Sequence, residues 1–278
     1  MRRRRLVIAA GMALLAGCRR DDAHKPVSTV PVRGGTLVFV SDREPLCLDP
    51  HVLGDMPQVY VAEQYLDRLV SMDAKGAIHP WLAVSWDISA DGMTYTFHLR
   101  RDVSFTDGTR FDAAAVKANL DHMVDPATHS GTAGGYIRQY VRTDIVDPYT
   151  ASVHLSAPYS AFLDVLAQGF LGMESPAALR RPRDVNCQSP VGSGPFRIVR
   201  WDHQNEIVFA RNPNYAWAPP SANHQGPAWL DGIAWRFISE PSVRFAALQA
   251  GEVDAIDTVP PRSRDAGTGQ SGSYPRDC

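Results

Sequence analysis

Hydrophobic and polar residues alternate along several short stretches of the chain, which predicts β-strands. One strand is predicted at 36–40, and two hairpins are predicted at 84–99 and 196–210. Asp91-Gly92 supplies the turn of the first hairpin, because this dipeptide readily adopts the positive φ angles of a tight turn. A further strand is predicted at 233–237, where every second residue is large and apolar.

Apolar residues at helical spacing predict four helices between these strands. Their capping or first-turn residues are Asp55, Asp112, Pro158 and Pro241. The first helix is expected to run over 58–70, and the last is expected to end at Gly251. The segment 131–135 is expected to be a loop. Because strands and helices interleave throughout, the predicted fold class is α/β.

The first eighteen residues resemble a bacterial export signal. Arg2–Arg5 precede a short apolar run, Leu6–Ala16, and Leu15-Ala16-Gly17-Cys18 resembles the lipobox of lipoproteins. The run is shorter than the roughly 20 apolar residues of a membrane span. The resemblance implies that lipid is attached to Cys18. A plain secretory signal with a chance cysteine, or an N-terminal core helix, is the alternative interpretation.

Composition changes at both ends of the chain and suggests its organisation. We expect a signal peptide at 1–17, a flexible tether at 18–33, a folded region at 34–261 and a disordered tail at 262–278. The tail is rich in Gly, Ser and Arg and lacks any apolar period. Export would place the mature protein in the periplasm or cell envelope, anchored to the membrane by its lipid.

Charge and motifs exclude several function classes. Net charge is −2, so no basic excess is present for binding nucleic acid. The nine histidines show no metal-binding spacing, and His122 and His129 are separated by a proline, so we expect surface or cleft histidines and no metal site. Gly192-Ser193-Gly194 lacks the pattern of a phosphate loop or of a nucleophile elbow. We therefore expect neither catalytic residues nor a cofactor.

Several segments, taken in order, resemble the bacterial extracellular solute-binding proteins of family 5, which serve ABC importers of peptides, dipeptides and nickel chelates. The resemblance covers about residues 34–261. The motifs that carry it are Leu48-Asp49-Pro50-His51, Tyr65-Leu66-Asp67-Arg68-Leu69, Pro80-Trp81-Leu82-Ala83, Asp107-Gly108-Thr109, Pro190-Val191-Gly192-Ser193-Gly194-Pro195-Phe196, Arg211-Asn212-Pro213-Asn214-Tyr215 and Leu248-Gln249-Ala250-Gly251-Glu252-Val253-Asp254.

The resemblance implies the first lobe of a two-lobe, class II periplasmic-binding-protein fold. That lobe would have a mixed sheet with flanking helices and an inserted α+β subdomain at about 71–165. The implied function is capture of a peptide or similar small solute and its delivery to ABC transporter permease subunits, by a monomer. An exported hydrolase or a structural lipoprotein is the alternative.

The family's cleft maps onto a few residues of this chain. Ser41, Asp42 and Glu44 lie in the loop after the opening strand, and Tyr136 lies at the edge of the small subdomain. We expect these residues to line the ligand site. Other roles remain open for these residues. Ser41 and Asp42 could form a turn, Asp42 and Glu44 could bind a ligand ammonium or cap a helix, and Tyr136 could pack in the core.

Two further expectations concern a pair of cysteines and the point at which the resemblance stops. Cys47 and Cys187 would both lie on the cleft side of one lobe, where they form a disulfide or remain buried thiols. Complete relatives continue into a second lobe, whereas the resemblance here stops near 261. We expect a frameshift or premature stop, and weak solute binding because the opposing wall is missing.

Overall fold

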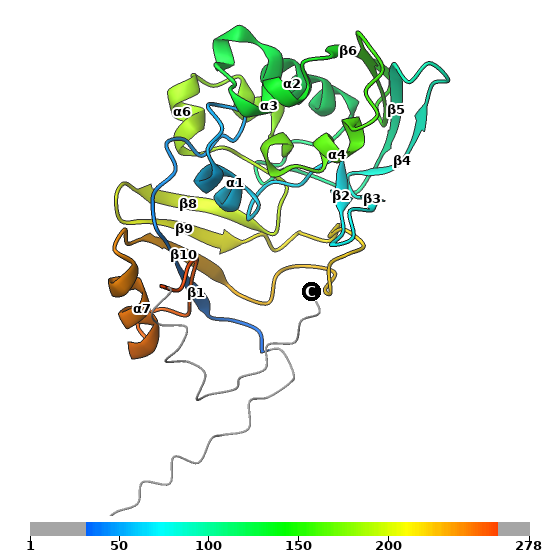
Figure 1. Cartoon of the computed structure of the whole chain (residues 1–278). Coiled ribbons are helices and arrows are strands. Elements are labelled where there is room, and N and C mark those ends of the chain that lie inside the picture. The colour runs from blue at the N-terminus through cyan, green and yellow to red at the C-terminus, as the bar shows by residue number, and fades with distance from the viewer. Residues whose placement is uncertain (1–31, 261–278) are drawn as a thin grey trace, which may run out of the picture. The chain divides into compact units, whose positions relative to one another are not determined.

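A mixed five-stranded sheet runs through the lower half of the molecule (Figure 1). The computed structural model describes residues 32–260. The strand order is β11-β1-β10-β9-β8. The bounds are Thr36–Ser41 for β1, Phe196–Asp202 for β8, Glu206–Arg211 for β9, Gly232–Phe237 for β10 and Ala255–Ile256 for β11. β1 pairs in parallel with both β10 and β11, and the other pairs are antiparallel.

A second, antiparallel sheet forms the upper part of the molecule in Figure 1. Its order is β4-β5-β7-β6, with bounds Ala83–Ile88, Thr94–Leu99, Thr150–Leu155 and Tyr140–Asp147. Helix α2 (Ala113–Val124) packs against it. A small hairpin of β2 (Val70–Met72) and β3 (Ile78–Pro80) lies between the two sheets in the chain order.

Short helices fill the connections, and their bounds are Met56–Ala62 for α1, Pro126–Thr128 for η1, Thr132–Tyr136 for α3, Phe162–Leu166 for α4, Gly169–Leu171 for η2, Pro176–Leu179 for α5, Arg183–Gln188 for α6 and Pro241–Ala250 for α7. Each sheet packs on its own hydrophobic cluster, one around Phe97, Leu120 and Val153 and the other around Tyr65, Phe209 and Ile233. The α/β class with mixed and antiparallel sheets is therefore confirmed.

Most of the elements expected from periodicity are present. Both predicted hairpins form, as β4-β5 and β8-β9. Asp112 caps α2 by accepting a hydrogen bond from the backbone of Ala115 at 2.9 Å. Helix α7 ends at Gly251, whose φ of 72° is in the left-handed region that glycine adopts without strain.

The helix expected at 58–70 was wrong in length, because α1 ends at Ala62. After the helix, the backbone of Tyr65 accepts a hydrogen bond from Gly194 at 2.9 Å, and Gln64 accepts one from Phe196 at 3.0 Å. The apolar spacing continues because Leu66 and Leu69 are still buried, although the chain there is no longer helical. Tertiary hydrogen bonding has overridden local helical propensity.

The loop expected at 131–135 was also wrong, since Thr132–Tyr136 forms α3. The Ser130 hydroxyl accepts a hydrogen bond from the Gly134 backbone at 2.8 Å, which supports the first turn. A Cβ on Gly134 would lie 2.5 Å from the Met123 carbonyl oxygen. Glycine at this position allows the short helix to approach α2 closely.

The segment Gly192-Ser193-Gly194 packs directly against the backbone that follows α1. A Cβ on Gly192 would lie 1.8 Å from the Tyr65 carbonyl oxygen, and one on Gly194 would lie 2.6 Å from its carbonyl carbon. Between the two glycines, Ser193 donates a hydrogen bond to the buried Asp67 at 2.8 Å. The two glycines therefore allow close backbone contact, and the motif joins the segment before β8 to the segment after α1.

Asp67 is fully buried and accepts hydrogen bonds from three side chains. Trp217 Nε1 donates at 2.8 Å and the Tyr215 hydroxyl donates at 3.3 Å, in addition to Ser193. Burial raises the pKa of Asp67 to about 6, although these hydrogen bonds act in the opposite direction. The native state therefore holds a proton on Asp67 more tightly than the unfolded chain does.

This difference predicts a pH-dependent effect of Asp67→Asn. Between the unfolded pKa of 3.8 and the folded pKa of about 6, the native protein binds more protons, so the contribution of Asp67 to stability falls as pH rises. The free energy of unfolding of the wild type, relative to Asp67→Asn, should fall by up to about 3 kcal/mol from pH 4 to pH 7. Urea denaturation at several pH values measures it. A difference that stays constant with pH would contradict the prediction.

Several expectations lie outside the described residues. The signal peptide, Cys18, most of the tether and the tail at 262–278 all fall there. Within 32–260, no helix has the length and apolar character needed to cross a membrane.

Candidate functional site

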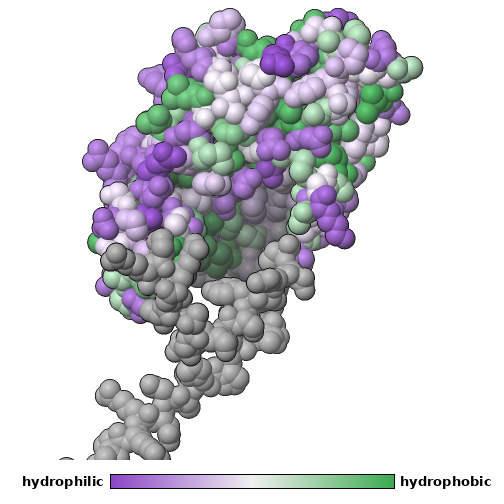
Figure 2. Space-filling model, in the orientation of Figure 1, coloured by the Kyte–Doolittle hydropathy of each residue, from purple (hydrophilic) through white to green (hydrophobic). Residues whose placement is uncertain are grey.

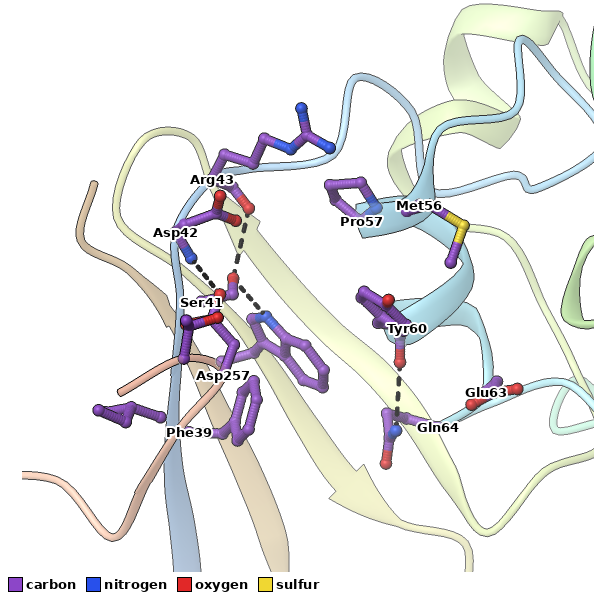
Figure 3. Close-up of a pocket in the computed structure, with 13 residues that line it drawn as sticks. Phe39, Ser41, Asp42, Arg43, Met56, Pro57, Tyr60, Glu63, Gln64 and Asp257 are labelled. Carbon is purple, nitrogen blue, oxygen red and sulfur yellow. Dashed lines mark hydrogen bonds between the residues drawn. The ribbon is translucent and has the colours of Figure 1, made fainter. Parts of the chain in front are cut away.

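A hollow of about 560 Å³ opens at the carboxyl ends of the parallel strands β1 and β10, beside α1. Its lining residues come from four parts of the chain (Figure 3) and are Phe39, Ser41, Asp42, Arg43, Met56, Pro57, Tyr60, Glu63, Gln64, Trp235, Ile256, Asp257 and Thr258. Figure 2 shows that this face of the molecule is hollowed, with hydrophobic side chains visible deep in the hollow. Small-molecule sites of open α/β sheets lie outside the carboxyl ends of strands, so the position suits a ligand.

Trp235 and Ser41 form a fixed part of the wall. The Trp235 indole nitrogen donates to the Ser41 hydroxyl at 2.9 Å, and that hydroxyl donates to the Arg43 carbonyl at 3.3 Å. The rings of Phe39 and Trp235 lie 4.3 Å apart between centroids. Because Ser41 is buried and its proton is committed to a carbonyl, it is held in place and is not activated as a nucleophile.

Charged groups of both signs lie at the rim. The Asp42 backbone donates to Asp257 Oδ2 at 2.8 Å, and Asp257 Oδ1 pairs with the buried guanidinium of Arg244 at 3.2 Å. Asp42 and Arg43 are exposed, and within 32–260 neither side chain has an ion-pair partner. The rim therefore offers a carboxylate and a guanidinium to a solute that carries both charges.

Helix α1 supplies the opposite side of the hollow. Asp55 caps the helix, and its carboxylate accepts from Gln58 N while the Gln58 side chain accepts from Asp55 N. Pro57 occupies the first turn, where its missing N–H costs nothing. The exposed side chain of Tyr60 points from the helix toward the hollow, where it offers an aromatic face (Figure 3).

The expected site residues are only partly together. Ser41 and Asp42 line the hollow, whereas Glu44 and Tyr136 are not among its lining residues. Glu44 Oε1 instead accepts hydrogen bonds in the β8-β9 turn, from Trp201 Nε1 at 2.6 Å and from Gln204 N at 3.1 Å. Tyr136 lies on α3 against Phe170, with 6.1 Å between ring centroids. Glu44 thus binds the β8-β9 hairpin and neither faces the hollow nor caps a helix, whereas Tyr136 has the packing role that the sequence left open.

Cys47, in the loop between β1 and α1, forms a disulfide with Cys187 of α6. Their Cα atoms lie 4.7 Å apart, and the Leu48 backbone donates to the Cys187 carbonyl at 2.8 Å. The bond ties this loop to α6, 140 residues further along the chain. The loop that leads from the hollow to α1 is therefore fixed at its middle.

Sequence reasoning missed Trp235, Tyr60 and Asp257 as parts of the hollow. They lie about 200 residues apart at the extremes, and no local motif relates them. It also expected surface or cleft histidines, which was wrong for His51, because that side chain is completely buried. Burial lowers the pKa of His51 to about 4, against the opposing charge of Asp49.

Fold and hollow together define a protein of the solute-binding class, with α/β layers and an open site at strand ends. The profile of the bacterial extracellular solute-binding proteins, family 5 (middle region), matches residues 77–273. The chain belongs to this family, which is one of binding proteins and not of enzymes.

Two kinds of relative illustrate the family. The glutathione-binding protein GsiB of Escherichia coli K12 is 36% identical over 213 residues, which are 77% of this chain and 40% of that protein. The chain thus spans about two fifths of the length of these curated relatives.

Among solved structures, the periplasmic binding protein DppA of Helicobacter pylori, in complex with the peptide STSA, is 27% identical with a TM-score of 0.75. That alignment covers 87% of this chain and 50% of DppA. AgaA of A. tumefaciens R10, in complex with agropinic acid, is 31% identical with a TM-score of 0.76 over 85% of this chain and 46% of AgaA.

Proposed function

We propose that this chain is the solute-contacting lobe of an ABC importer's binding protein, and that its ligands are peptides or similar small solutes. The observation that carries the proposal is the hollow at the end of β1, where Asp42 and Arg43 present opposite charges beside the aromatic face of Trp235. A peptide carries an ammonium and a carboxylate, which match these two groups. The names of the relatives, a glutathione-binding protein and a peptide complex, support this ligand class.

The proposed lobe comprises residues 34–261, with the inserted subdomain at about 71–165. Strands β1 and β10 and helix α1 all belong to one lobe and leave the hollow open to solvent, whereas small-molecule sites normally enclose most of their ligand. Tight capture would need a second lobe that closes over the solute before delivery to the permease subunits. The alternative of an exported hydrolase is not favoured, since the lining contains no histidine, cysteine or lysine to activate a nucleophile.

Peptide binding should perturb one tryptophan indole of this chain and leave another unchanged. Titration with a pool of di- to pentapeptides is expected to shift the indole N–H resonance of Trp235, because its hydrogen bond to Ser41 forms part of the hollow. The indole of Trp201, which donates to Glu44, is the internal control. Two-dimensional ¹H–¹⁵N NMR records both resonances in one experiment.

The proposal has two parts, that the hollow binds peptides and that this lobe alone binds them weakly, and the affinity tests the second. We expect dissociation constants weaker than micromolar, because the open hollow of one lobe buries only part of the peptide. Asp42→Asn should weaken the Trp235 shift several-fold, as it removes the carboxylate partner of the peptide ammonium. Equal shifts of both indoles, or no shift at millimolar peptide, would contradict a ligand site here. Micromolar or tighter binding would contradict the inference that this lobe alone encloses only part of the peptide.

We further propose that the mature protein begins at Cys18 and is anchored in the cell envelope by lipid on that residue. Leu15-Ala16-Gly17 in front of Cys18 supports cleavage and acylation. Intact mass after extraction from membranes should equal residues 18–278 plus acyl groups, and Cys18→Ser should release the protein from the membrane fraction. A chain that retains Met1 without lipid would rule this out.

A further inference from the structure

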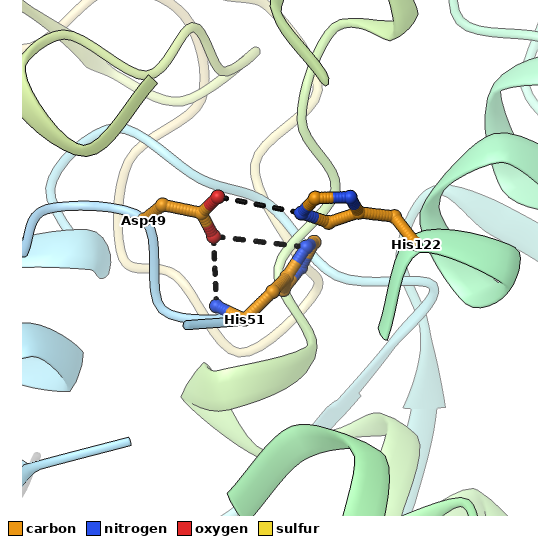
Figure 4. A group of neighbouring side chains, drawn as sticks. All are labelled: Asp49, His51 and His122. Carbon is orange, nitrogen blue, oxygen red and sulfur yellow. Dashed lines mark hydrogen bonds and ion pairs between the residues drawn. The ribbon is translucent and has the colours of Figure 1, made fainter. Parts of the chain in front are cut away.

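Asp49, His51 and His122 bring three side chains with metal-binding atoms together in the interior (Figure 4). One ligand atom from each lies within 4.8 Å of the others. Asp49 and His51 lie in the loop between β1 and α1, whereas His122 is in the last turn of α2. Asp49 and His51 are completely buried, and the His122 side chain is 20% exposed. The cluster thus connects the loop to α2, and its ligand nitrogens are buried.

The hydrogen bonds of His51 determine which of its nitrogens points into the cluster as an acceptor. Nε2 lies 2.8 Å from the Gly172 carbonyl oxygen, which can only accept a hydrogen bond, so Nε2 carries the proton. In the neutral ring, Nδ1 then holds a lone pair. Nδ1 is buried without a hydrogen-bond partner and lies 3.8 Å from Asp49 Oδ1.

His122 is oriented in the same manner. The Thr128 hydroxyl donates its only proton to the His122 carbonyl at 2.6 Å, and it therefore accepts from His122 Nδ1 at 3.2 Å. This leaves the lone pair of the neutral ring on Nε2. That atom also is buried without a hydrogen-bond partner, and it lies 3.4 Å from Asp49 Oδ2.

The Asp49 carboxylate is held in position between the two rings. Oδ1 accepts from the His51 backbone at 2.8 Å, and Oδ2 accepts from Asn186 Nδ2 at 2.9 Å. Two imidazole lone pairs and a buried carboxylate therefore face one another in the neutral rings, which is unfavourable unless a proton or a metal cation lies among them. Around a tetrahedral zinc ion with bonds of about 2.0–2.1 Å, neighbouring ligand atoms are about 3.3 Å apart. The 3.4 Å between Asp49 Oδ2 and His122 Nε2 is close to this spacing, and the 3.8 Å between Asp49 Oδ1 and His51 Nδ1 is somewhat longer.

We propose that Asp49, His51 and His122 bind a divalent transition-metal ion, with zinc as the best chemical match. Two imidazoles and one carboxylate are a donor set that zinc favours, and each imidazole is oriented by a hydrogen bond from its other nitrogen to an oxygen. Water would complete the coordination. The ion would fasten the loop before α1 to α2, and it is separate from the solute hollow.

The test measures metal retention and coordination in the full chain, expressed without a polyhistidine tag. After removal of metal by a chelator, the protein is dialysed against Zn²⁺ and the bound metal is measured by mass spectrometry. We expect one more equivalent of tightly held zinc in the wild type than in His122→Gln, with at least ten-fold weaker binding in that variant. The control is His98→Gln, because His98 is a half-exposed histidine paired with Asp87 on the surface. It should bind zinc like the wild type.

Cobalt substitution of the wild type keeps the proposal testable if His122→Gln fails to fold. Co²⁺ bound by two imidazoles and a carboxylate in a tetrahedral site should give intense visible absorption bands, and zinc should displace them. Equal zinc retention in the wild type and His122→Gln, or weak octahedral-type cobalt bands only, would overturn the proposal. The cluster would then be held by the contacts of Asp49 with His51 and His122 alone.

Discussion

Removing the disulfide by Cys47→Ala with Cys187→Ala should lower the free energy of unfolding by about 4–5 kcal/mol. The bond closes a loop of 140 residues, and in the chain-entropy model a loop of this order restricts the unfolded chain by that amount. Because single domains are stable by only about 5–15 kcal/mol, the variant should be marginally folded. Urea denaturation followed by circular dichroism measures the change.

The control for the disulfide is Cys278→Ser, which removes a thiol and leaves the Cys47–Cys187 pair intact. Its unfolding midpoint should equal that of the wild type without reductant. Adding a strong reductant should bring the wild type to the midpoint of the double variant. If reductant leaves the wild-type midpoint unchanged while the thiols become titratable, the bond contributes nothing to stability.

Replacing Gly192 by alanine should destabilise the fold by at least about 3 kcal/mol. The added Cβ would lie 1.8 Å from the Tyr65 carbonyl oxygen and 2.6 Å from Leu66 Cδ2. The first contact involves backbone, which cannot swing away as a flexible side chain does, so the two chain segments must separate. That separation would also weaken the hydrogen bond from Ser193 to Asp67.

Gly135→Ala is the matched control for this substitution. Gly135 lies in α3, and a Cβ there meets no atom within 4 Å. Alanine favours a helix over glycine, so this variant should be as stable as the wild type or more stable by up to about 1 kcal/mol. Both variants are compared by thermal unfolding. Equal melting temperatures of Gly192→Ala and the wild type would show that the fold does not require close approach of Gly192 to the Tyr65 backbone.

The sequence predicted those elements whose pattern is local. The β4-β5 and β8-β9 hairpins follow from alternation and a turn, and α2 follows from Asp112 and its apolar stripe. The resemblance also selected Ser41 and Asp42, and both line the hollow, although Ser41 is the last residue of β1 and only Asp42 lies in the loop after it.

What the sequence missed depends on contacts between distant segments. Helix α1 ends early because the backbone of Tyr65 bonds to Gly194, which no local propensity records. The same holds for Glu44, whose carboxylate accepts a hydrogen bond from Trp201 of β8, and for the approach of His51 to His122. The partners of such residues are set by topology, and spacing along the chain carries no sign of them.

The position of β1 between β11 and β10 determines when that part of the sheet is assembled during synthesis. Gly35 and Val38 bond to Asp231 and Asp254, which are 196 and 216 residues further along the chain. At about 5–20 residues per second, the first strand waits on the order of ten seconds or more for its two neighbours to emerge from the ribosome. Contacts of such long range also make folding slow. The growing chain therefore leaves β1 without its partner strands until β10 and β11 have been synthesised.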